Sequence, residues 1–139
     1  MALRIKGSIN GMYHGRLIEN IGMASGEVAV AGQGYFLDGG KWSKSSTTNA
    51  IEAICIKGGA TPVMEIVKAG DLIEADYTGT PNAGFVPGLS AAVLDANGAN
   101  VNAATVTGGH LRVLNVDEAN KKVQVIALKN FTVRDSEQV

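Results

Sequence analysis

The chain has 139 residues, of which 45% are hydrophobic and 18% charged, and its formal net charge is −1. This composition suits one globular domain over residues 1–139 and is too apolar for a disordered chain. The near-neutral charge, with Lys and Arg spread along the chain, argues against a nucleic-acid-binding protein.

The N-terminal region is predicted to be extended. Residues 3–9 have the short apolar pattern of a strand. They form either an arm, within residues 1–15, that pairs with a neighbouring subunit, or an ordinary edge strand of the same chain. An arm would make its contacts through Leu3, Ile5 and Ile9. The region shows no signal-peptide core, and no run of about 18 apolar residues occurs in the chain, so neither secretion nor membrane insertion is expected.

The next part of the chain is predicted to contain two strands separated by a long loop. The strands are residues 26–31 and 50–56. The loop, residues 32–49, contains four glycines and a Ser/Thr cluster. A loop of that length is unusual inside a compact domain.

Three aromatic residues lie in this loop: Tyr35, Phe36 and Trp42, the only tryptophan of the chain. In one interpretation they fold back and close one end of the core. In the other, some of them stay near the surface and anchor a partner, because Trp and Tyr concentrate binding energy at interfaces. Both interpretations remain open at this point.

The middle of the chain is predicted to form strand, turn and strand. Residues 62–67 and 72–77 are the strands, and residues 68–71 form the tight turn between them. Residues 78–88 are rich in Gly, Pro and Asn. Because prolines cannot donate to a strand ladder, this segment is predicted to be a loop that crosses the outside of a barrel.

Two hairpins follow. The first has strands at residues 89–94 and 100–107 around Asn97-Gly98, a dipeptide typical of type I′ turns. The second has strands at residues 111–116 and 122–128, and both faces of its last strand are partly apolar, as in a barrel or a covered sheet. The predicted fold class is therefore all-β. It is a small compact barrel or sandwich with an extended N-terminal arm and a long Gly/Ser-rich loop.

The C-terminal end offers a counterpart to the N-terminal arm. Residues 131–133 are aromatic or β-branched, and Phe131 is the candidate contact residue. An edge strand within the same chain is again the alternative. Residues 134–139 are predicted to be a polar tail.

Residues with the chemistry of catalysis or metal binding are few. His14, His110 and Cys55 cannot supply a Cys/His zinc site, and Cys55 lies in an apolar run typical of a buried small side chain. Glu74 and Asp76 would share one strand face, where a solvated surface is favoured over an acid pair. We therefore predict no enzymatic activity, no cofactor and no metal site.

One part of the chain resembles a known family. The features are the turn and strand at residues 68–73, the Gly/Pro-rich loop at 80–88 and the Val-rich strands within 111–128. Together they resemble the small β-barrel domains of phage capsid decoration proteins, also called head cement proteins. The resemblance implies a structural virion protein on the capsid exterior, added after assembly in the host cytoplasm. Its partner would be the major capsid protein, which it would bridge and stabilise as a homo-oligomer, with a trimer favoured.

Two other functions are compatible with an all-β chain of this composition. One is a different phage structural component, such as a tail or fibre protein. The other is a module that binds a carbohydrate or another small ligand, for which loop aromatics would supply the contact surface.

Overall fold

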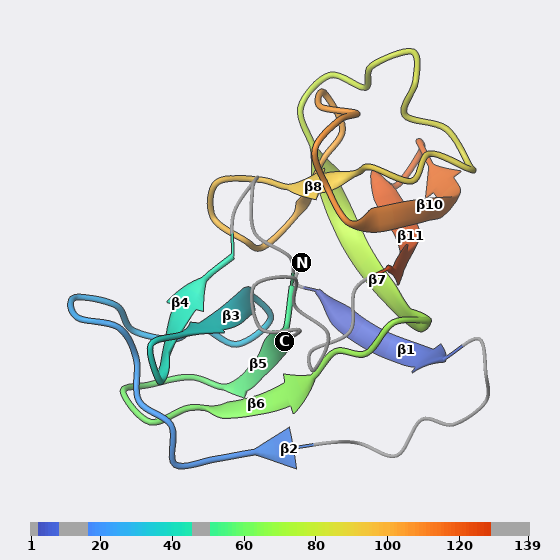
Figure 1. Cartoon of the computed structure of the whole chain (residues 1–139). Helices are drawn as coiled ribbons and strands as arrows, with labels where there is room; N and C mark the ends of the chain where they lie inside the picture. Colours follow the sequence, from blue (N-terminus) through green and yellow to red (C-terminus); the bar gives the residue numbers. More distant parts are fainter. Residues whose placement is uncertain (1–2, 9–16, 46–50, 129–139) are drawn as a thin grey trace.

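A computed structural model describes residues 3–8, 17–45 and 51–128 (Figure 1). All the regular secondary structure in these residues is β-strand. The prediction of an all-β fold is confirmed. The strands, which form two sheets, are β1 (Arg4–Ser8), β2 (Leu17–Ile18), β3 (Gly34–Asp38), β4 (Lys41–Lys44), β5 (Ala53–Lys57), β6 (Val63–Ile66), β7 (Asp71–Thr78), β8 (Val93–Leu94), β9 (Val101–Asn102), β10 (Leu111–Asp117) and β11 (Lys122–Ala127).

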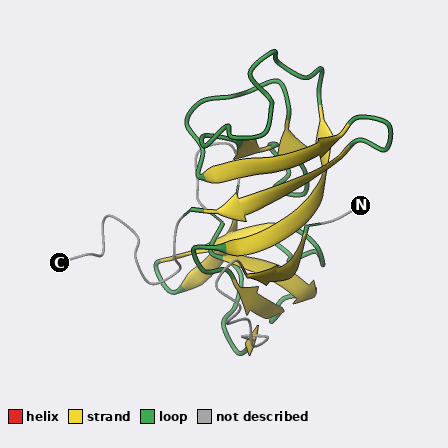
Figure 2. Ribbon diagram, turned by 90° about the vertical axis from the view of Figure 1, so that its right-hand side faces the viewer, coloured by secondary structure: helices red, strands yellow, loops and turns green. Residues whose placement is uncertain are grey.

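The first sheet curls back on itself. Its strand order is β10-β11-β7-β9-β8, and β1 pairs with the first half of β7. Just before β8, Ala92 forms a bridge with Leu111 at the start of β10, so the two ends of the strand order meet. Figure 2 shows the strands of this sheet crossing the molecule one above another. This sheet is the barrel-like part of the predicted fold.

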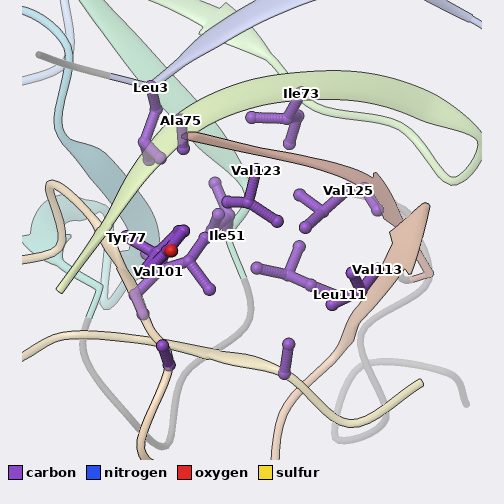
Figure 3. Packing of buried hydrophobic residues seen from close by; sticks show 14 of the residues in the cluster. Leu3, Ile51, Ile73, Ala75, Tyr77, Val101, Leu111, Val113, Val123 and Val125 are labelled. Carbon is purple, nitrogen blue, oxygen red and sulfur yellow. The ribbon is translucent and has the colours of Figure 1, made fainter. Parts of the chain in front are cut away.

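The inside of the curled sheet holds the larger of two apolar cores. Alternation along β7 points Ile73, Ala75 and Tyr77 inward, and Ile73 lies opposite Val125 of β11 (Figure 3). The first core consists of Leu3, Ile51, Ile54, Val67, Ile73, Ala75, Tyr77, Phe85, Ala92, Leu94, Val101, Ala103, Leu111, Val113, Val123, Val125 and Ala127. Phe85 comes from the loop after β7 and packs edge-on against Tyr77, with ring centroids 5.4 Å apart. The loop thus contributes to the core and does more than cross the outside of the barrel.

The second sheet is built from the chain between β1 and β7, in the order β2-β6-β5-β3-β4. Side chains of β5 alternate between two environments, since Ile54 belongs to the first core whereas Ala53 and Cys55 face the other way. The second core consists of Ala29, Tyr35, Trp42, Ala53, Cys55 and Met64, with Ile18, Ile21, Met23, Leu37 and Ile66 packed against it. The segment before β3 therefore covers the face of this sheet that points away from the first core.

The prediction of a loop at residues 32–49 is wrong for most of that range. It contains the hairpin β3–β4, in which Asp38 pairs with Lys41 and only Gly39 and Gly40 form the turn. Both glycines have positive φ, 60° and 84°, as a two-residue hairpin turn of this hand requires. A Gly-Gly pair between two strand-like runs was the signal for this hairpin.

The predicted strand at residues 26–31 is also wrong. These residues form one isolated bridge, between Ala29 and Gly59, and no strand. Position 58 has to be glycine here, because a Cβ on Gly58 would lie 2.5 Å from the Ala29 carbonyl oxygen. The close approach of the two backbones replaces a regular ladder.

The predicted strands on either side of residues 68–71 are confirmed, but they belong to different sheets. β6 pairs with β2 and β5, whereas β7 pairs with β1, β9 and β11. The turn between them is closed by Asp71, whose Oδ2 accepts the amide hydrogen of Lys68 at 2.8 Å. The chain passes from the second sheet to the first at this turn.

The hairpin around Asn97-Gly98 exists, but it is shorter than predicted and lacks the type I′ turn. Only two residues on each side pair, and Asn97 does not have the positive φ that type I′ requires. Asp95 organises a wider loop instead. Its carboxylate accepts the amide hydrogens of Asn97 and Ala99 at 3.1 and 3.3 Å and the side-chain amide of Asn100 at 3.0 Å.

Replacing Asp95 with alanine is expected to destabilise the protein by about 1–2 kcal/mol, because the loop amides lose their acceptor. The loop also joins the sheets, since the Gly98 carbonyl oxygen accepts the amide hydrogen of Gly34 at 2.8 Å. Urea denaturation followed by circular dichroism measures the change. Asp95→Asn retains one acceptor oxygen and should lose less stability. Unchanged stability of Asp95→Ala would contradict the prediction.

The C-terminal hairpin β10–β11 is confirmed. A bulge between Val113 and Asn115 shifts the register and leaves Leu114 39% exposed. The bulge contributes to the irregular apolar pattern of this hairpin. Phe131 and the predicted tail at residues 134–139 lie outside the described residues.

Candidate functional site

The N-terminal contact residues predicted from the sequence lie within the fold. Leu3 is 2% exposed in the first core, and Ile5 packs against that core. β1 pairs antiparallel with β7 of the same chain, with Ile5 opposite Ile73. The described part of the predicted arm is therefore an ordinary strand, which was the alternative interpretation. Ile9 lies outside the described residues.

Tyr35 and Trp42 are each 1% exposed in the second core. Alternation along the β3–β4 hairpin explains this, since Tyr35 and Leu37 face the second core and Trp42 pairs with Leu37. Phe36 points to the opposite face of the sheet and is half-buried. The core interpretation thus holds for Tyr35 and Trp42, and neither side chain is available as a surface anchor.

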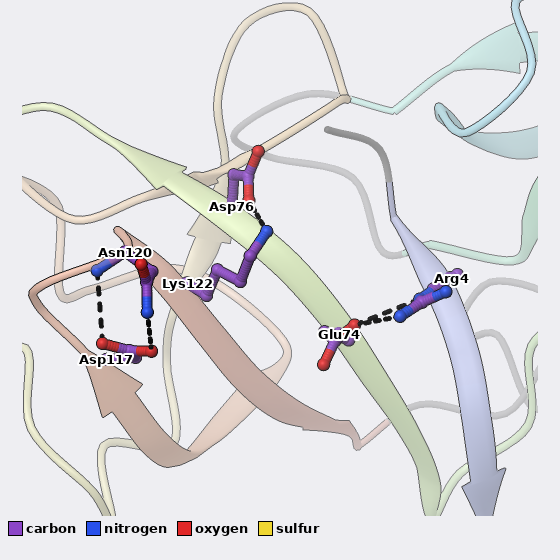
Figure 4. A network of polar contacts seen from close by, with 6 residues as sticks. All are labelled: Arg4, Glu74, Asp76, Asp117, Asn120 and Lys122. Atoms are coloured by element: carbon purple, nitrogen blue, oxygen red, sulfur yellow. Dashed lines mark hydrogen bonds and ion pairs between the residues drawn. The ribbon is translucent and has the colours of Figure 1, made fainter.

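The outer face of the first sheet carries a network of paired charges (Figure 4). Arg4 donates to Glu74 from Nε at 3.1 Å and from Nη2 at 2.6 Å, and Lys122 Nζ donates to Asp76 at 2.9 Å. The hydrogen bonds from Arg4 lower the pKa of Glu74. A general acid at neutral pH needs the opposite shift, so the geometry favours a solvated strand face over an acid pair.

Cys55 is buried in the second core, as predicted, and burial raises the pKa of its thiol. His110 precedes β10 and is half-buried, whereas His14 lies outside the described residues. Within residues 3–8, 17–45 and 51–128, no group of three or more His, Cys, Asp or Glu side chains could hold a metal ion. The same residues contain no helix with the length and hydrophobicity needed to cross a membrane.

An exposed apolar surface lies on the segment that covers the second core, and the sequence analysis missed it. Val28 is 67% and Val30 51% exposed, while Ala29 between them is 3% exposed. The two valines line a shallow depression of about 450 Å³ together with Gly26, Glu27, Gln33, Tyr35 and Lys44. We call these seven residues the valine surface. The alternation of Val, Ala and Val was its only signal in the sequence.

Hydrogen bonds to Gly59 and Tyr35 hold the backbone of the valine surface in place. Ala29 exchanges two backbone hydrogen bonds with Gly59, at 3.2 and 3.0 Å. The Val30 amide donates to the Tyr35 hydroxyl at 2.9 Å, and that hydroxyl donates to Gln33 Oε1 at 3.2 Å. Burial raises the pKa of Tyr35, which keeps this donor protonated.

The rim of the valine surface is polar and also fixed. Glu27 Oε1 accepts the amide hydrogen of Lys44 at 2.9 Å, which ties the start of the segment to β4. An apolar centre with a polar rim is the usual composition of a protein-binding surface. Because the backbone is held, binding would order few additional groups.

No protein-family model, no curated protein and no solved structure matches the chain. The segments that carry the resemblance to decoration proteins all lie among the described residues. Residues 68–71 join the two sheets, residues 80–88 supply Phe85 to the first core, and β10 and β11 form one end of the first sheet.

Proposed function

We propose that the protein is a structural virion protein that binds the outer surface of a phage capsid and stabilises the shell by bridging major capsid proteins. The observation that carries this proposal is the valine surface, with two large apolar side chains held outward by hydrogen bonds. Contiguous exposed apolar side chains are typical of protein–protein contact sites. The resemblance of residues 63–128 to decoration proteins supports the same function.

A weak contact of this kind is sufficient on a capsid. Burying one valine contributes about 1.5 kcal/mol or more, so the valine pair alone would give only modest affinity. A closed homo-oligomer presents the same surface several times to a symmetric shell, and the linked contacts then add through effective concentration. We therefore propose a trimer, which light scattering of the purified protein tests directly.

Co-sedimentation with a panel of purified, expanded heads of tailed phages tests the function. We expect saturable binding to at least one head and a higher temperature for disruption of that head. The proposal would be contradicted if the protein bound none of the heads in the panel.

Two variants test whether the valine surface makes the contact. The double substitution Val28→Ser and Val30→Ser is expected to weaken binding at least about tenfold, because it removes most of the apolar area. Val86→Ser is the matched control, since Val86 is 49% exposed on a different loop. Equal binding by the double variant and the wild type would exclude the valine surface as the contact.

The alternatives predict different observations. A tail or fibre component would form filaments in negative-stain images, where the proposed trimer forms closed particles. A carbohydrate-binding module would place an aromatic ring at its surface, but Trp42 is 1% exposed. We therefore expect no quenching of Trp42 fluorescence by a panel of glycans.

A further inference from the structure

The loop between β8 and β9, residues 95–100, contains Asn97-Gly98, a pair of residues that can react with each other. We call it the Asp95 loop. In an Asn-Gly pair the glycine nitrogen attacks the side-chain carbonyl carbon of the asparagine, and glycine has no side chain to obstruct the attack. Asn97 is exposed, so its side chain is accessible, whereas Gly98 is buried. The reactive carbonyl and the attacking nitrogen therefore lie in different environments.

The Gly98 nitrogen is held by the folded loop. It donates its hydrogen to the Asp95 carbonyl oxygen at 3.0 Å. On either side of it, the Asp95 carboxylate accepts the amide hydrogens of Asn97 and Ala99 at 3.1 and 3.3 Å. The nitrogen must lose its proton before it can attack, and a buried, hydrogen-bonded amide exchanges its proton with water only when the structure opens locally. The closed loop therefore suppresses the reaction.

The space around Gly98 is also closed. A Cβ on Gly98 would lie 2.5 Å from the carbonyl oxygen of Ser45 and 3.2 Å from that of Gly34. The Gly98 oxygen accepts the amide hydrogen of Gly34 at 2.8 Å, and the Ser45 amide donates to the Gly34 oxygen at 2.9 Å. Gly98 thus lies at a junction, where the Asp95 loop meets the start of β3 and the residue that follows β4.

We propose that Asn97-Gly98 is a self-modification site that reacts when the Asp95 loop opens, and that the isoaspartate product then prevents the loop from closing against β3. The deprotonated Gly98 nitrogen forms a bond to Asn97 Cγ, and the side-chain nitrogen leaves as ammonia, which carries away the amide proton. Water then opens the succinimide ring at either carbonyl and leaves aspartate or isoaspartate. The reaction consumes water, releases ammonia and involves no oxidation or reduction.

The isoaspartate product disturbs the junction because its main chain runs through the former side chain and is longer by one carbon atom. Gly98 fits closely against the backbone oxygens of Ser45 and Gly34, so the longer chain cannot be accommodated without moving it. Moving Gly98 breaks the hydrogen bond that its oxygen accepts from Gly34. The aspartate product keeps the normal main chain and leaves this bond intact. This property concerns the fold and does not depend on the proposed capsid function.

Peptide mapping by mass spectrometry measures the reaction at Asn97 in the full chain, incubated in mildly alkaline buffer with and without denaturing urea. We expect conversion to be at least about tenfold slower in the folded protein, because local opening must come first. The Gly98 amide should be protected from hydrogen exchange by the same factor within about threefold, since the same opening controls both. Mapping separates this site from the other Asn-Gly pair, Asn10-Gly11, which lies outside the described residues. Equal conversion rates in the folded and unfolded protein overturn the proposal.

Asp95→Ala tests whether the Asp95 loop provides the protection. We expect conversion at Asn97 in the folded variant to be about fivefold faster or more, the factor that corresponds to the loss of an ordinary hydrogen bond. Asp117→Ala is the matched control, because the Asp117 carboxylate likewise accepts the backbone and side-chain amides of Asn120, at 3.2 and 2.9 Å, in another turn. It should leave the rate at Asn97 unchanged. Equal rates in the two variants would overturn this assignment.

Hydrogen exchange of the Gly34 amide tests the effect of the product on the junction. The isoaspartate form is purified by chromatography from aged wild-type protein. Asn97→Asp is the matched control, because it carries the same charge on a normal main chain. We expect the Gly34 amide of the isoaspartate form to lose about fivefold or more of its protection relative to this control. Equal protection in the two proteins would overturn the proposed effect on β3.

Discussion

Replacing Gly109 with alanine is expected to destabilise the protein by about 3 kcal/mol or more, because the added methyl group has no space in the fold. A Cβ at position 109 would overlap the carbonyl oxygen of Ala92 and would lie 2.7 Å from a methyl carbon of Val93. Ala92 and Leu111 form the bridge that closes the first sheet, and both belong to the first core. Moving residues 91–93 away would open the sheet and expose that core.

Gly108→Ala is the matched control for this prediction. A Cβ on Gly108 would meet no atom within 4 Å, but its φ is +87°. Alanine there should lose only about 1–2 kcal/mol, the usual effect of a left-handed conformation. Urea denaturation of both variants separates overlap from backbone strain. The overlap argument fails if Gly109→Ala is no less stable than Gly108→Ala.

Trp42→Ala is expected to destabilise the protein by about 3–5 kcal/mol, because it removes the largest buried side chain and leaves a cavity in the second core. The loss should be concentrated in the second sheet. Trp42 also carries backbone hydrogen bonds to the covering segment, from its amide to the Gly22 oxygen at 3.0 Å and from the Ala24 amide to its own oxygen at 2.9 Å.

Circular dichroism in urea gives the total loss for Trp42→Ala, and hydrogen exchange locates it. We expect the Ala24 amide to lose more protection than the amides of Val123 and Val125 in the first sheet. Phe36→Ala is the matched control, since Phe36 lies on the same hairpin but is half-buried on the opposite face. A loss for Trp42→Ala no larger than that for Phe36→Ala would contradict the assignment of Trp42 to a closely packed core.

The fold class and most strands could be predicted from the sequence, because local patterns carry that information. The β10–β11 hairpin shows this, since two β-branched runs flank a short polar turn. The assignment of strands to sheets could not be predicted. β6 and β7 look like the two strands of a hairpin, yet the turn at residues 68–71 leads the chain into another sheet. Which sheet a strand joins depends on contacts far away in the sequence.

The candidate site was less predictable than the fold, because exposure depends on tertiary packing. Tyr35 and Trp42 have the composition of an interface but fill the second core. Val28 and Val30 have the composition of a core strand but are exposed, since Ala29 alone turns inward to the bridge with Gly59. Aromatic and β-branched side chains suit both environments, so a single sequence does not distinguish them.

The position of the second sheet, between β1 and β7 in the chain, has a consequence for the order of folding. Arg4 and Glu74, which pair across these two strands, are 70 positions apart. Closing such a long loop is entropically unfavourable until the segment within it has become compact. During synthesis on a ribosome, β1 emerges first but cannot pair until β7 has emerged, and by then the whole of β2 to β6 has been synthesised. The second sheet is therefore expected to form early, and docking of the N-terminal strand is expected to be a late and slow step of folding.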